Sequence, residues 1–476
     1  MNLKTQALTA LAGLALLPAC GGPGIASVFQ SSNPSDLSGI HKIQHVVVIM
    51  QENRSFDNYF GTYPGAEGIP MQNGVPTVCV PDPQTNTCVL PFHDSGDKDQ
   101  DAPHFATDAA ADVDGGKMDG FIRQEIAALQ TSCQGSSDPN CTNLGPQPNL
   151  MGYHDAREIS NYWTYSQEFV LQDHMFESTT SWSQISHLFM VSAWSASCTN
   201  PYDPMSCTSD LSDPDHFISN KNLDGPIPGY AWTDLTYLMF KAHVSWAYYV
   251  DGGYQPDCDD TATPINCAPV PQNAGVPEIW NPLPDFMDVH QDGQLGNIQD
   301  LKFFYTAVKE GKLPNVVWIV PNGQDSEHAP NLISDGQAYV TGIINALMQS
   351  PEWNSTAIFL AWDDWGGLYD NVVPPAVDQN GYGIRVPALV ISPYAKKGLI
   401  DPQVLSFDAY LKFIEDDFLG GQRIDPKTDG RPDSRPDVRE NATVLGNLIS
   451  DFDFNQAPRP PLLLPPRPQP GPASVG

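Results

Sequence analysis

The chain has 476 residues, of which 41% are hydrophobic and 10% aromatic, a composition typical of a globular protein. Its 23 Lys and Arg and 56 Asp and Glu give a net charge of −33. That charge repels nucleic acid and anionic membranes, so neither is expected as a partner. The acidic excess fits an exported protein that binds cations, although solubility alone explains most of the carboxylates.

Residues 1–19 are predicted to be a signal peptide, because Lys4 precedes an apolar run too short to span a bilayer. Leu17-Pro18-Ala19-Cys20 resembles a bacterial lipobox, in which a lipidated Cys20 would tether the chain to a membrane. Cleavage by the ordinary signal peptidase is the alternative. We expect export to the periplasm, the outer membrane or the medium. Residues 20–40, rich in Gly, Ser and Pro, are predicted to be a flexible tether.

No linker divides residues 41–455, which are predicted to form one catalytic domain with an α/β fold. Short apolar runs predict buried strands, with helical stretches between them, and this alternation indicates a mostly parallel sheet covered by helices on both faces. The predicted strands are Val46–Met50, Val244–Val250, Val316–Val320, Thr356–Trp362 and Pro387–Ile391, and the predicted helices are Gly120–Gln130, Ile298–Lys312, Ala338–Gln349 and Ser406–Phe418. Residues 456–476 are Pro-dense and are predicted to be a disordered, extended tail.

Eight further cysteines fall into four close couples, which indicates disulfides that staple surface insertions. The couples are Cys79 and Cys88, Cys133 and Cys141, Cys198 and Cys207, and Cys258 and Cys267. A zinc site is the weaker interpretation, because the chain has no C-x-x-C or Cys/His spacing. The spacing alone does not fix which cysteines pair.

Polar groups follow three of the predicted strands. Val46–Met50 runs into Glu52 and Asn53, Thr356–Trp362 into Asp363 and Asp364, and Val316–Val320 into a loop that contains His328. Ligands bind beyond the carboxyl ends of the strands in open α/β sheets, so these side chains are expected to line one site.

Glu52, Asp363 and Asp364 cannot all stay ionised at one site without a cation. Together with the Asn53 amide oxygen they form an oxygen-rich ligand set for a divalent metal ion. For an isolated Asp-Asp-x-Gly-Gly, a turn or helix cap is the simpler interpretation. The second cluster after a parallel strand favours metal binding.

The runs 52–57 (ENRSFD), 363–370 (DDWGGLYD) and 326–328 (SEH) resemble the bacterial phosphoesterase family, which holds the non-specific phospholipases C and related acid phosphatases. The resemblance extends over most of the chain, including 385–387 and 429–436. It implies a fold like that of alkaline phosphatase and hydrolysis of phosphoric esters. It also implies a divalent metal ion as cofactor and a phospholipid or small phosphate ester as substrate.

The resemblance implies a Ser or Thr nucleophile within residues 181–195. Aligning His187 and Leu188 with the family's His-Leu places Ser183 as the nucleophile, with Thr180 and Ser181 as neighbouring alternatives. The chain departs from the family pattern at 185–186, where Ile and Ser replace the usual Pro and Asn.

His328 and His104 resemble the family histidines that donate to phosphoryl oxygens or protonate the leaving alcohol, and His290 is a weaker third candidate. Arg54 and Asp57 are interpreted as structural.

The sequence thus predicts an exported, metal-dependent phosphoric-ester hydrolase, most like phospholipase C, that acts through a phosphoseryl intermediate on Ser183. An acid phosphatase that acts on monoesters is the alternative enzyme. A cation-binding surface lipoprotein is the non-enzymatic alternative. A lipid substrate calls for an apolar entrance, and six aromatic residues would either supply it or pack in the core: Trp163, Trp182, Phe189, Trp194, Trp232 and Trp365.

Overall fold

The computed structural model describes residues 37–474 apart from 101, 133–147, 213, 215–216, 219–226, 257–268 and 425–438. The predicted signal peptide, Cys20 and most of the predicted tether therefore lie outside the described residues. The chain divides into a unit of residues 1–37 and a unit of residues 38–476, and all the elements below belong to the second unit. Of the helices in the described ranges, none has both the length and the apolar character needed to cross a bilayer.

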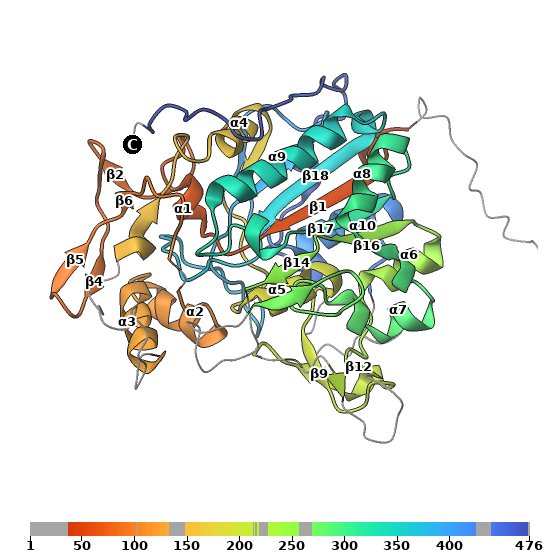
Figure 1. The fold of residues 1–476 in the computed structure, drawn as a ribbon, viewed down its shortest axis with the longest axis horizontal. Coiled ribbons are helices and arrows are strands. Elements are labelled where there is room, and N and C mark those ends of the chain that lie inside the picture. Colours follow the sequence, from red (N-terminus) through yellow and green to blue (C-terminus); the bar gives the residue numbers. More distant parts are fainter. Residues whose placement is uncertain are drawn as a thin grey trace, which may run out of the picture. The chain divides into compact units, whose positions relative to one another are not determined.

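An eight-stranded sheet forms the centre of this unit (Figure 1). Its strands, in spatial order, are β16 (Ile298–Asp300), β13 (Trp246–Val250), β17 (Val316–Val320), β1 (His45–Gln51), β18 (Thr356–Trp362), β19 (Ala388–Ile391), β8 (Val170–Gln172) and β20 (Leu399–Asp401). Neighbours pair in parallel except at β19, which is antiparallel to both β18 and β8. The fold is therefore α/β with a mostly parallel sheet, as predicted.

The longest apolar runs form the centre of the sheet. β17 and β18 coincide with their predicted ranges, and every residue of both strands is buried. β1 lies between them and pairs with both in parallel. The predicted helix over 298–312 is wrong at its start, because residues 298–300 pair with β13 as edge strand β16. Asp300 then caps the helix that follows by accepting the backbone N–H of Lys302.

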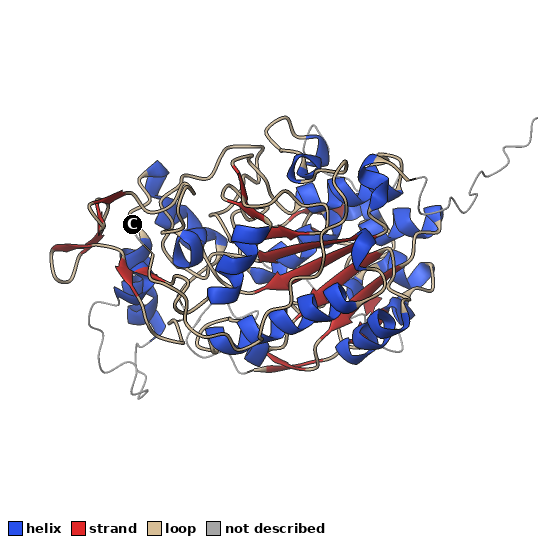
Figure 2. Ribbon diagram, turned by 90° about the horizontal axis from the view of Figure 1, so that it is seen from above, coloured by secondary structure: helices blue, strands red, loops and turns tan. Residues whose placement is uncertain are grey.

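Helices lie on both sides of the strands (Figure 2). They are α1 (Phe56–Phe60), α2 (Ala106–Val113), α3 (Phe121–Ser132), α4 (Ser160–Glu168), α5 (Ser183–Ser192), α6 (Leu235–Ala242), α7 (Met287–Gln291), α8 (Leu301–Glu310), α9 (Ile333–Gln349) and α10 (Asp408–Phe418). The main hydrophobic core joins the central strands to the inner faces of several of these helices, including Ile343 and Ile344 of α9 and Leu411 and Ile414 of α10, whereas α2 and α3 pack in a separate cluster. The six aromatic residues considered above for an apolar entrance are all buried.

Short two-stranded ladders lie outside the main sheet: β2 (Met71–Gln72) with β3 (Val75–Pro76), β4 (Val80–Asp82) with β5 (Thr87–Val89), β6 (Phe92–His93) with β7 (Gly152–Tyr153), β9 (Ala196–Cys198) with β10 (Cys207–Ser209), β11 (Phe217–Ile218) with β12 (Ile227–Pro228), and β14 (Gly253–Gln255) with β15 (Val270–Gln272). Disulfides join Cys79 to Cys88 and Cys198 to Cys207, so two of the four predicted couples are paired locally. The other four cysteines lie outside the described residues.

The prediction of a disordered C-terminal tail is wrong for residues 457–474. This segment is extended and runs past α4 and α9 (dark blue in Figure 1). Proline removes N–H donors but leaves the carbonyls, and side chains on the two helices bind them: Asn161 donates to Pro465 O, and Asn345 donates to Leu464 O. The backbone N–H of Leu464 returns a bond to the Asn345 amide oxygen. These bonds, with Leu462 and Leu464 packed on the core, fix the segment.

Candidate active site

The carboxyl ends of β1 and β18 bring their polar residues together, as expected for adjacent parallel strands. After β1, Asn53 adopts a positive φ of 57°, and its backbone N–H donates to Asp363 Oδ1 at 2.9 Å. Gly366 lies against the same turn, where a Cβ would come within 2.8 Å of both the Asn53 Cβ and its carbonyl oxygen. Only glycine fits there, which explains Gly366, the first glycine of the pair that follows the two aspartates.

Ser183 lies beside this turn, on the first residue of α5. Its hydroxyl donates to Asp364 Oδ2 at 3.1 Å, and Asp364 Oδ1 accepts the backbone N–H of Gly366 at 2.7 Å. Both side chains are fully buried. The predicted nucleophile therefore contacts a carboxylate to which its proton can pass.

His187 belongs to the same cluster. This residue was given no role of its own in the prediction from sequence and served only to align residues 181–195 with the family motif. Its Nε2 lies 3.1 Å from Glu52 Oε1 and 4.0 Å from Asp363 Oδ2. These three residues each offer a ligand atom within 4.8 Å of the others. The signal was present in the sequence, because positions four apart on a helix share a face, and His187 is four residues after Ser183.

The residues at this cluster fit a divalent cation. Asn53 Oδ1 and Asp363 Oδ2 are buried and accept no hydrogen bond in the structure. A buried polar atom without a partner is costly, and a cation would satisfy both oxygens. Carboxylate and amide oxygens with one imidazole nitrogen suit several divalent metals, so the donor set does not identify the ion.

A second group of possible metal ligands consists of His93, Asp155 and Glu158, whose ligand atoms lie within 4.8 Å of one another. It does not fit a cation as well, because Arg157 already donates to both carboxylate oxygens of Asp155, at 2.9 Å each. The guanidinium holds the pKa of Asp155 at about 2, against the effect of partial burial. A metal there would have to displace an existing positive charge.

The two predicted catalytic histidines flank the cluster, with ring centroids 6.0 Å apart. The Nδ1 atoms of His104 and His328 lie 2.6 and 2.7 Å from the carbonyls of Ala102 and Ala329. A carbonyl only accepts, so both rings carry their proton on Nδ1 when neutral. His104 Nε2 then accepts from Asn53 Nδ2 at 3.2 Å, which orients the amide oxygen of Asn53 away from that ring. His290 is exposed on α7 and bonds Pro284 O instead.

A further carboxylate, Glu177, lies close to Asp364 and was not singled out from the sequence. Its Oε1 accepts from the Ser186 hydroxyl at 3.1 Å and from the Ser181 N–H at 3.2 Å. Burial, with the nearby charges of Asp364 and Asp363, raises the pKa of Glu177 well above its ordinary value. The serine that departs from the family pattern at 186 thus has a buried partner, and the pair anchors the first turn of α5.

Glu327 links the loop that carries His328 to three other elements. Tyr162 and Tyr59 donate their hydroxyls to its carboxylate at 2.5 and 2.6 Å, and Trp362 Nε1 donates at 3.0 Å. Trp362 is the last residue before Asp363, so this bond ties the histidine loop to the carboxylate turn. Burial raises the pKa of Glu327 to about 7, in spite of these donors.

The free energy of unfolding is expected to depend on the titration of Glu327. Its carboxyl binds a proton more tightly in the folded chain than in the unfolded one, so its stabilising contribution is complete below pH 4.5 and is lost as the pH rises through about 7. Between pH 4.5 and about 7, this titration would lower the free energy of unfolding by about 3 kcal/mol. Urea unfolding at pH 4.5, 6 and 8 should show a flatter dependence for Glu327→Gln. Glu310→Gln, at the exposed end of α8, should keep the wild-type dependence.

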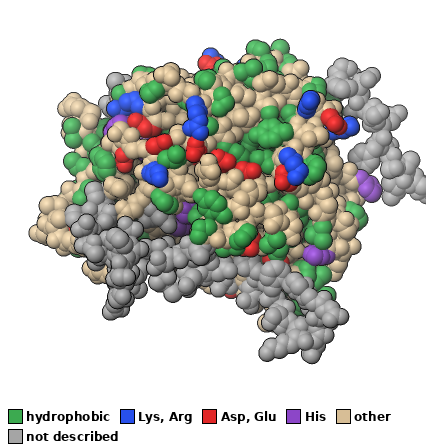
Figure 3. All heavy atoms as spheres, in the orientation of Figure 1, with side chains coloured by type: hydrophobic (Ala, Val, Ile, Leu, Met, Phe, Trp, Pro, Cys, Tyr) green, Lys and Arg blue, Asp and Glu red, His purple; other side chains and the backbone are tan. Residues whose placement is uncertain are grey.

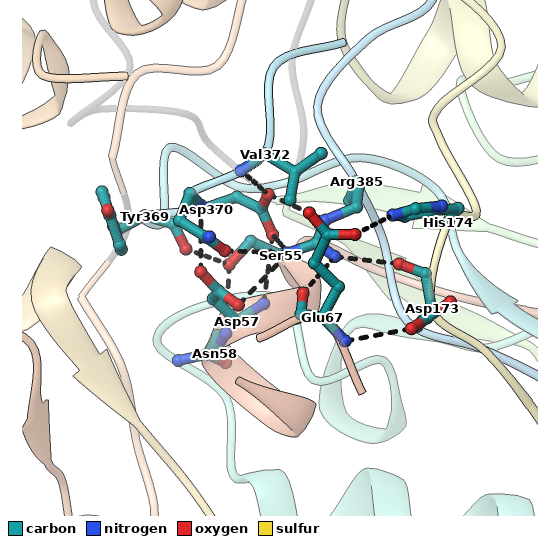
Figure 4. A network of polar contacts seen from close by, with 11 residues as sticks. Ser55, Asp57, Asn58, Glu67, Asp173, His174, Tyr369, Asp370, Val372 and Arg385 are labelled. Atoms are coloured by element: carbon teal, nitrogen blue, oxygen red, sulfur yellow. Dashed lines mark hydrogen bonds and ion pairs between the residues drawn. The ribbon is translucent and has the colours of Figure 1, made fainter. Parts of the chain in front are cut away.

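A buried ion network holds the two motif runs together behind the site (Figure 4). Arg385 donates through Nε and a terminal nitrogen to Asp370 at 2.9 and 3.1 Å, and to Asp57 at 3.3 Å. Asp57 in turn accepts the backbone N–H of Asn371, and Ser55 donates its hydroxyl to Tyr369 O. Burial opposes the charge of Arg385, but Asp370 and Asp57 outweigh it and raise the guanidinium pKa.

We expect Arg385→Met to lower the free energy of unfolding by about 3–5 kcal/mol, because it leaves two buried carboxylates without their cation. Arg157→Met is the matched control, since its ion pair with Asp155 is partly exposed and is expected to contribute about 1 kcal/mol or less. Urea unfolding of both variants at one pH measures the difference. Equal losses would mean that Arg385 contributes only packing.

Comparisons with known proteins identify the family of this chain. The model of the phosphoesterase family matches residues 43–419. The chain is 27% identical to a non-hemolytic phospholipase C of Pseudomonas aeruginosa over 414 residues, and 25% identical to phospholipase C B of Mycobacterium tuberculosis over 458 residues. A non-specific phospholipase C4 of Arabidopsis thaliana is 24% identical over 395 residues.

The matches cover 79% of the chain and 54% of the Pseudomonas relative, and 88% of the chain and 79% of the Mycobacterium relative. The chain thus spans about half the length of the first of these proteins. Among solved structures, an alkaline phosphatase superfamily protein of Vibrio parahaemolyticus matches at 12% identity over 72% of each chain, with a TM-score of 0.29. Because the family model covers most of the sequence, the chain belongs to the phosphoesterase family.

Proposed function

We propose that this protein is a metal-dependent hydrolase of phosphoric diesters that acts like a phospholipase C, with Ser183 as its nucleophile. The observation that carries the proposal is the contact of the Ser183 hydroxyl with Asp364, next to the Glu52, His187 and Asp363 group. The phospholipase C relatives support a phospholipid substrate.

In the proposed reaction, Ser183 Oγ attacks the phosphorus and its proton passes to Asp364 Oδ2, 3.1 Å away. The P–O bond to diacylglycerol breaks, and His328, which enters this step protonated on both ring nitrogens, gives its Nε2 proton to the departing oxygen. Water then attacks the phosphorus of the serine phosphodiester and gives a proton to His328 Nε2. The P–Oγ bond breaks, Asp364 returns its proton to Ser183 Oγ, and the phosphorylated headgroup leaves. When bound by Glu52, Asn53, Asp363, Asp364 and His187, a divalent cation would neutralise charge that develops on the phosphoryl oxygens.

The surrounding contacts preorganise these groups. Trp280 lies next to both imidazoles, with its ring centroid 6.5 Å from that of His187 and 6.3 Å from that of His328. Asn53 is held by His104 on one side and by the Asp363 carboxylate on the other. Groups fixed in this way need little reorganisation as charge develops in the transition state. Export, with or without a lipid on Cys20, is part of the proposal, since the substrate lies in membranes.

Phosphorus NMR of the products tests the function. The purified chain, supplied with Zn²⁺, Mn²⁺, Ca²⁺ or Mg²⁺ in turn, is incubated with phosphatidylcholine and a simple phosphomonoester in one mixture. Phosphocholine is the expected first product. Inorganic phosphate from the monoester alone would show an acid phosphatase instead, and no product with any metal between pH 5 and 9 would favour a cation-binding protein.

A further inference from the structure

The two most exposed large apolar side chains among the described residues lie in one turn. Met205 is 67% exposed and Tyr202 is 60% exposed, and both belong to the segment 199–206 that joins β9 to β10. We name this segment the hairpin tip. A tyrosine combines an apolar ring with a polar end, and methionine is flexible and apolar, so both suit the boundary between headgroups and acyl chains.

The hairpin tip is held in shape without a partner. The Cys198–Cys207 disulfide closes its base. Asn200 Oδ1 accepts the N–H of Tyr202 at 3.1 Å, and Asp203 Oδ1 accepts the N–H of Met205 at 3.0 Å. A surface that is already ordered loses little conformational entropy when it binds.

The same hairpin is tied to the segment that carries the nucleophile. Directly after β10, Leu211 O accepts the Ser181 hydroxyl at 2.6 Å, and Ser212 O accepts Trp182 Nε1 at 2.8 Å. Ser183 is the next residue of the chain. In addition, β9 begins four residues after α5 ends. Contact of the hairpin tip with a surface would therefore bring the first turn of α5 close to that surface.

Charge selects the kind of surface. Residues 158–220 contain no Lys or Arg, and the hairpin tip carries Asp203. The Lys and Arg side chains visible in Figure 3 lie in the upper part of that view. Without a basic residue the hairpin gains nothing from anionic lipids and is repelled by them. A zwitterionic phospholipid surface carries no net charge and therefore does not repel the hairpin.

We propose that the hairpin tip inserts Tyr202 and Met205 into the interface of a zwitterionic phospholipid membrane and so presents the substrate to the site. The proposal rests on the proposed function, since it assumes that the substrate is a membrane lipid. It concerns a surface separate from any lipid on Cys20.

The test compares the double variant Tyr202→Ser, Met205→Ser with a matched pair, Phe240→Ser with Phe303→Ser, two aromatic residues that are 41% and 48% exposed on α6 and α8. All chains carry Cys20→Ser, which removes any covalent lipid. Flotation with phosphatidylcholine vesicles in EDTA measures binding without turnover. Hydrolysis of the same vesicles and of soluble p-nitrophenyl phosphorylcholine, with metal restored, measures activity.

We expect the hairpin variant to bind phosphatidylcholine vesicles about tenfold more weakly or worse, with a matching loss of kcat/KM on vesicles. Its kcat/KM on the soluble ester should stay at the wild-type value, which also shows that it folds. The matched pair should behave as wild type, and vesicles rich in phosphatidylglycerol should bind wild type more weakly than phosphatidylcholine does.

The outcomes separate the two proposals. If wild type hydrolyses both substrates and the hairpin variant keeps full vesicle binding and activity, the docking surface is overturned and the function stands. Wild type that fails to float with phosphatidylcholine also overturns it. If wild type hydrolyses neither substrate, yet floats, and the hairpin variant does not, the function fails and the docking surface stands.

Discussion

Replacing Ser183 by alanine is expected to lower kcat by about 10⁴-fold or more, because the reaction would lose the atom that bonds to phosphorus. The hydroxyl has a single role in the structure, as the donor to Asp364. Its loss leaves a small buried gap and should alter the free energy of unfolding by only about 1 kcal/mol. The rate of phosphocholine release, monitored by phosphorus NMR at saturating metal and substrate, gives kcat.

Ser181→Ala and Thr180→Ala are the controls, since both hydroxyls were open alternatives in the sequence. The structure distinguishes them from Ser183. Ser181 Oγ donates to Leu211 O at 2.6 Å, and Thr180 Oγ1 donates to Tyr382 O at 3.1 Å, so each hydroxyl is bound to a backbone carbonyl rather than a carboxylate. Both variants should keep kcat within about tenfold of wild type. Full activity of Ser183→Ala beside an inactive Ser181→Ala would move the nucleophile to Ser181.

The centre of the fold could be predicted because its strands are buried on both faces. Val316–Val320 and Thr356–Trp362 are continuous apolar runs, and each forms a strand over its predicted residues. The edge strands β16 and β20, and β8 next to β20, have only three residues each, too few for a recognisable pattern. The antiparallel direction of β19 could not be predicted either, because four apolar residues alone do not show whether a strand pairs in parallel or antiparallel.

The site could be predicted where it follows strands, but not where it depends on side-chain packing. The rule for the carboxyl ends of parallel strands was enough to group Asn53 with Asp363. Glu177 was not among the predicted residues, and Glu327 was noted only as part of the run 326–328, because the roles of both come from burial and from partners elsewhere in the chain. The C-terminal tail was misjudged for a similar reason: its composition gives no sign that Asn161 and Asn345 bind its carbonyls.

Asp363→Asn is expected to weaken divalent cation binding by about 100-fold or more, and to lower activity in parallel when the metal is limiting. Asp363 Oδ2 is the buried oxygen without a hydrogen bond, 4.0 Å from His187 Nε2, so an amide nitrogen at this position would remove an anionic ligand. Oδ1 would remain an acceptor for the Asn53 N–H, which keeps the turn intact. Isothermal titration of the metal-free chain with Mn²⁺ or Zn²⁺ measures the affinity.

The same titration decides between the two groups that could hold a cation. Asp155→Asn alters the second group, where Arg157 already occupies the carboxylate, and should leave the affinity within about twofold of wild type. A large loss in Asp155→Asn with none in Asp363→Asn would place the tight cation site at His93 and Glu158. Because cation binding is measured without substrate, this result is independent of which phosphoric ester the protein hydrolyses. The titration and the Ser183 variant thus test the two halves of the proposed mechanism separately.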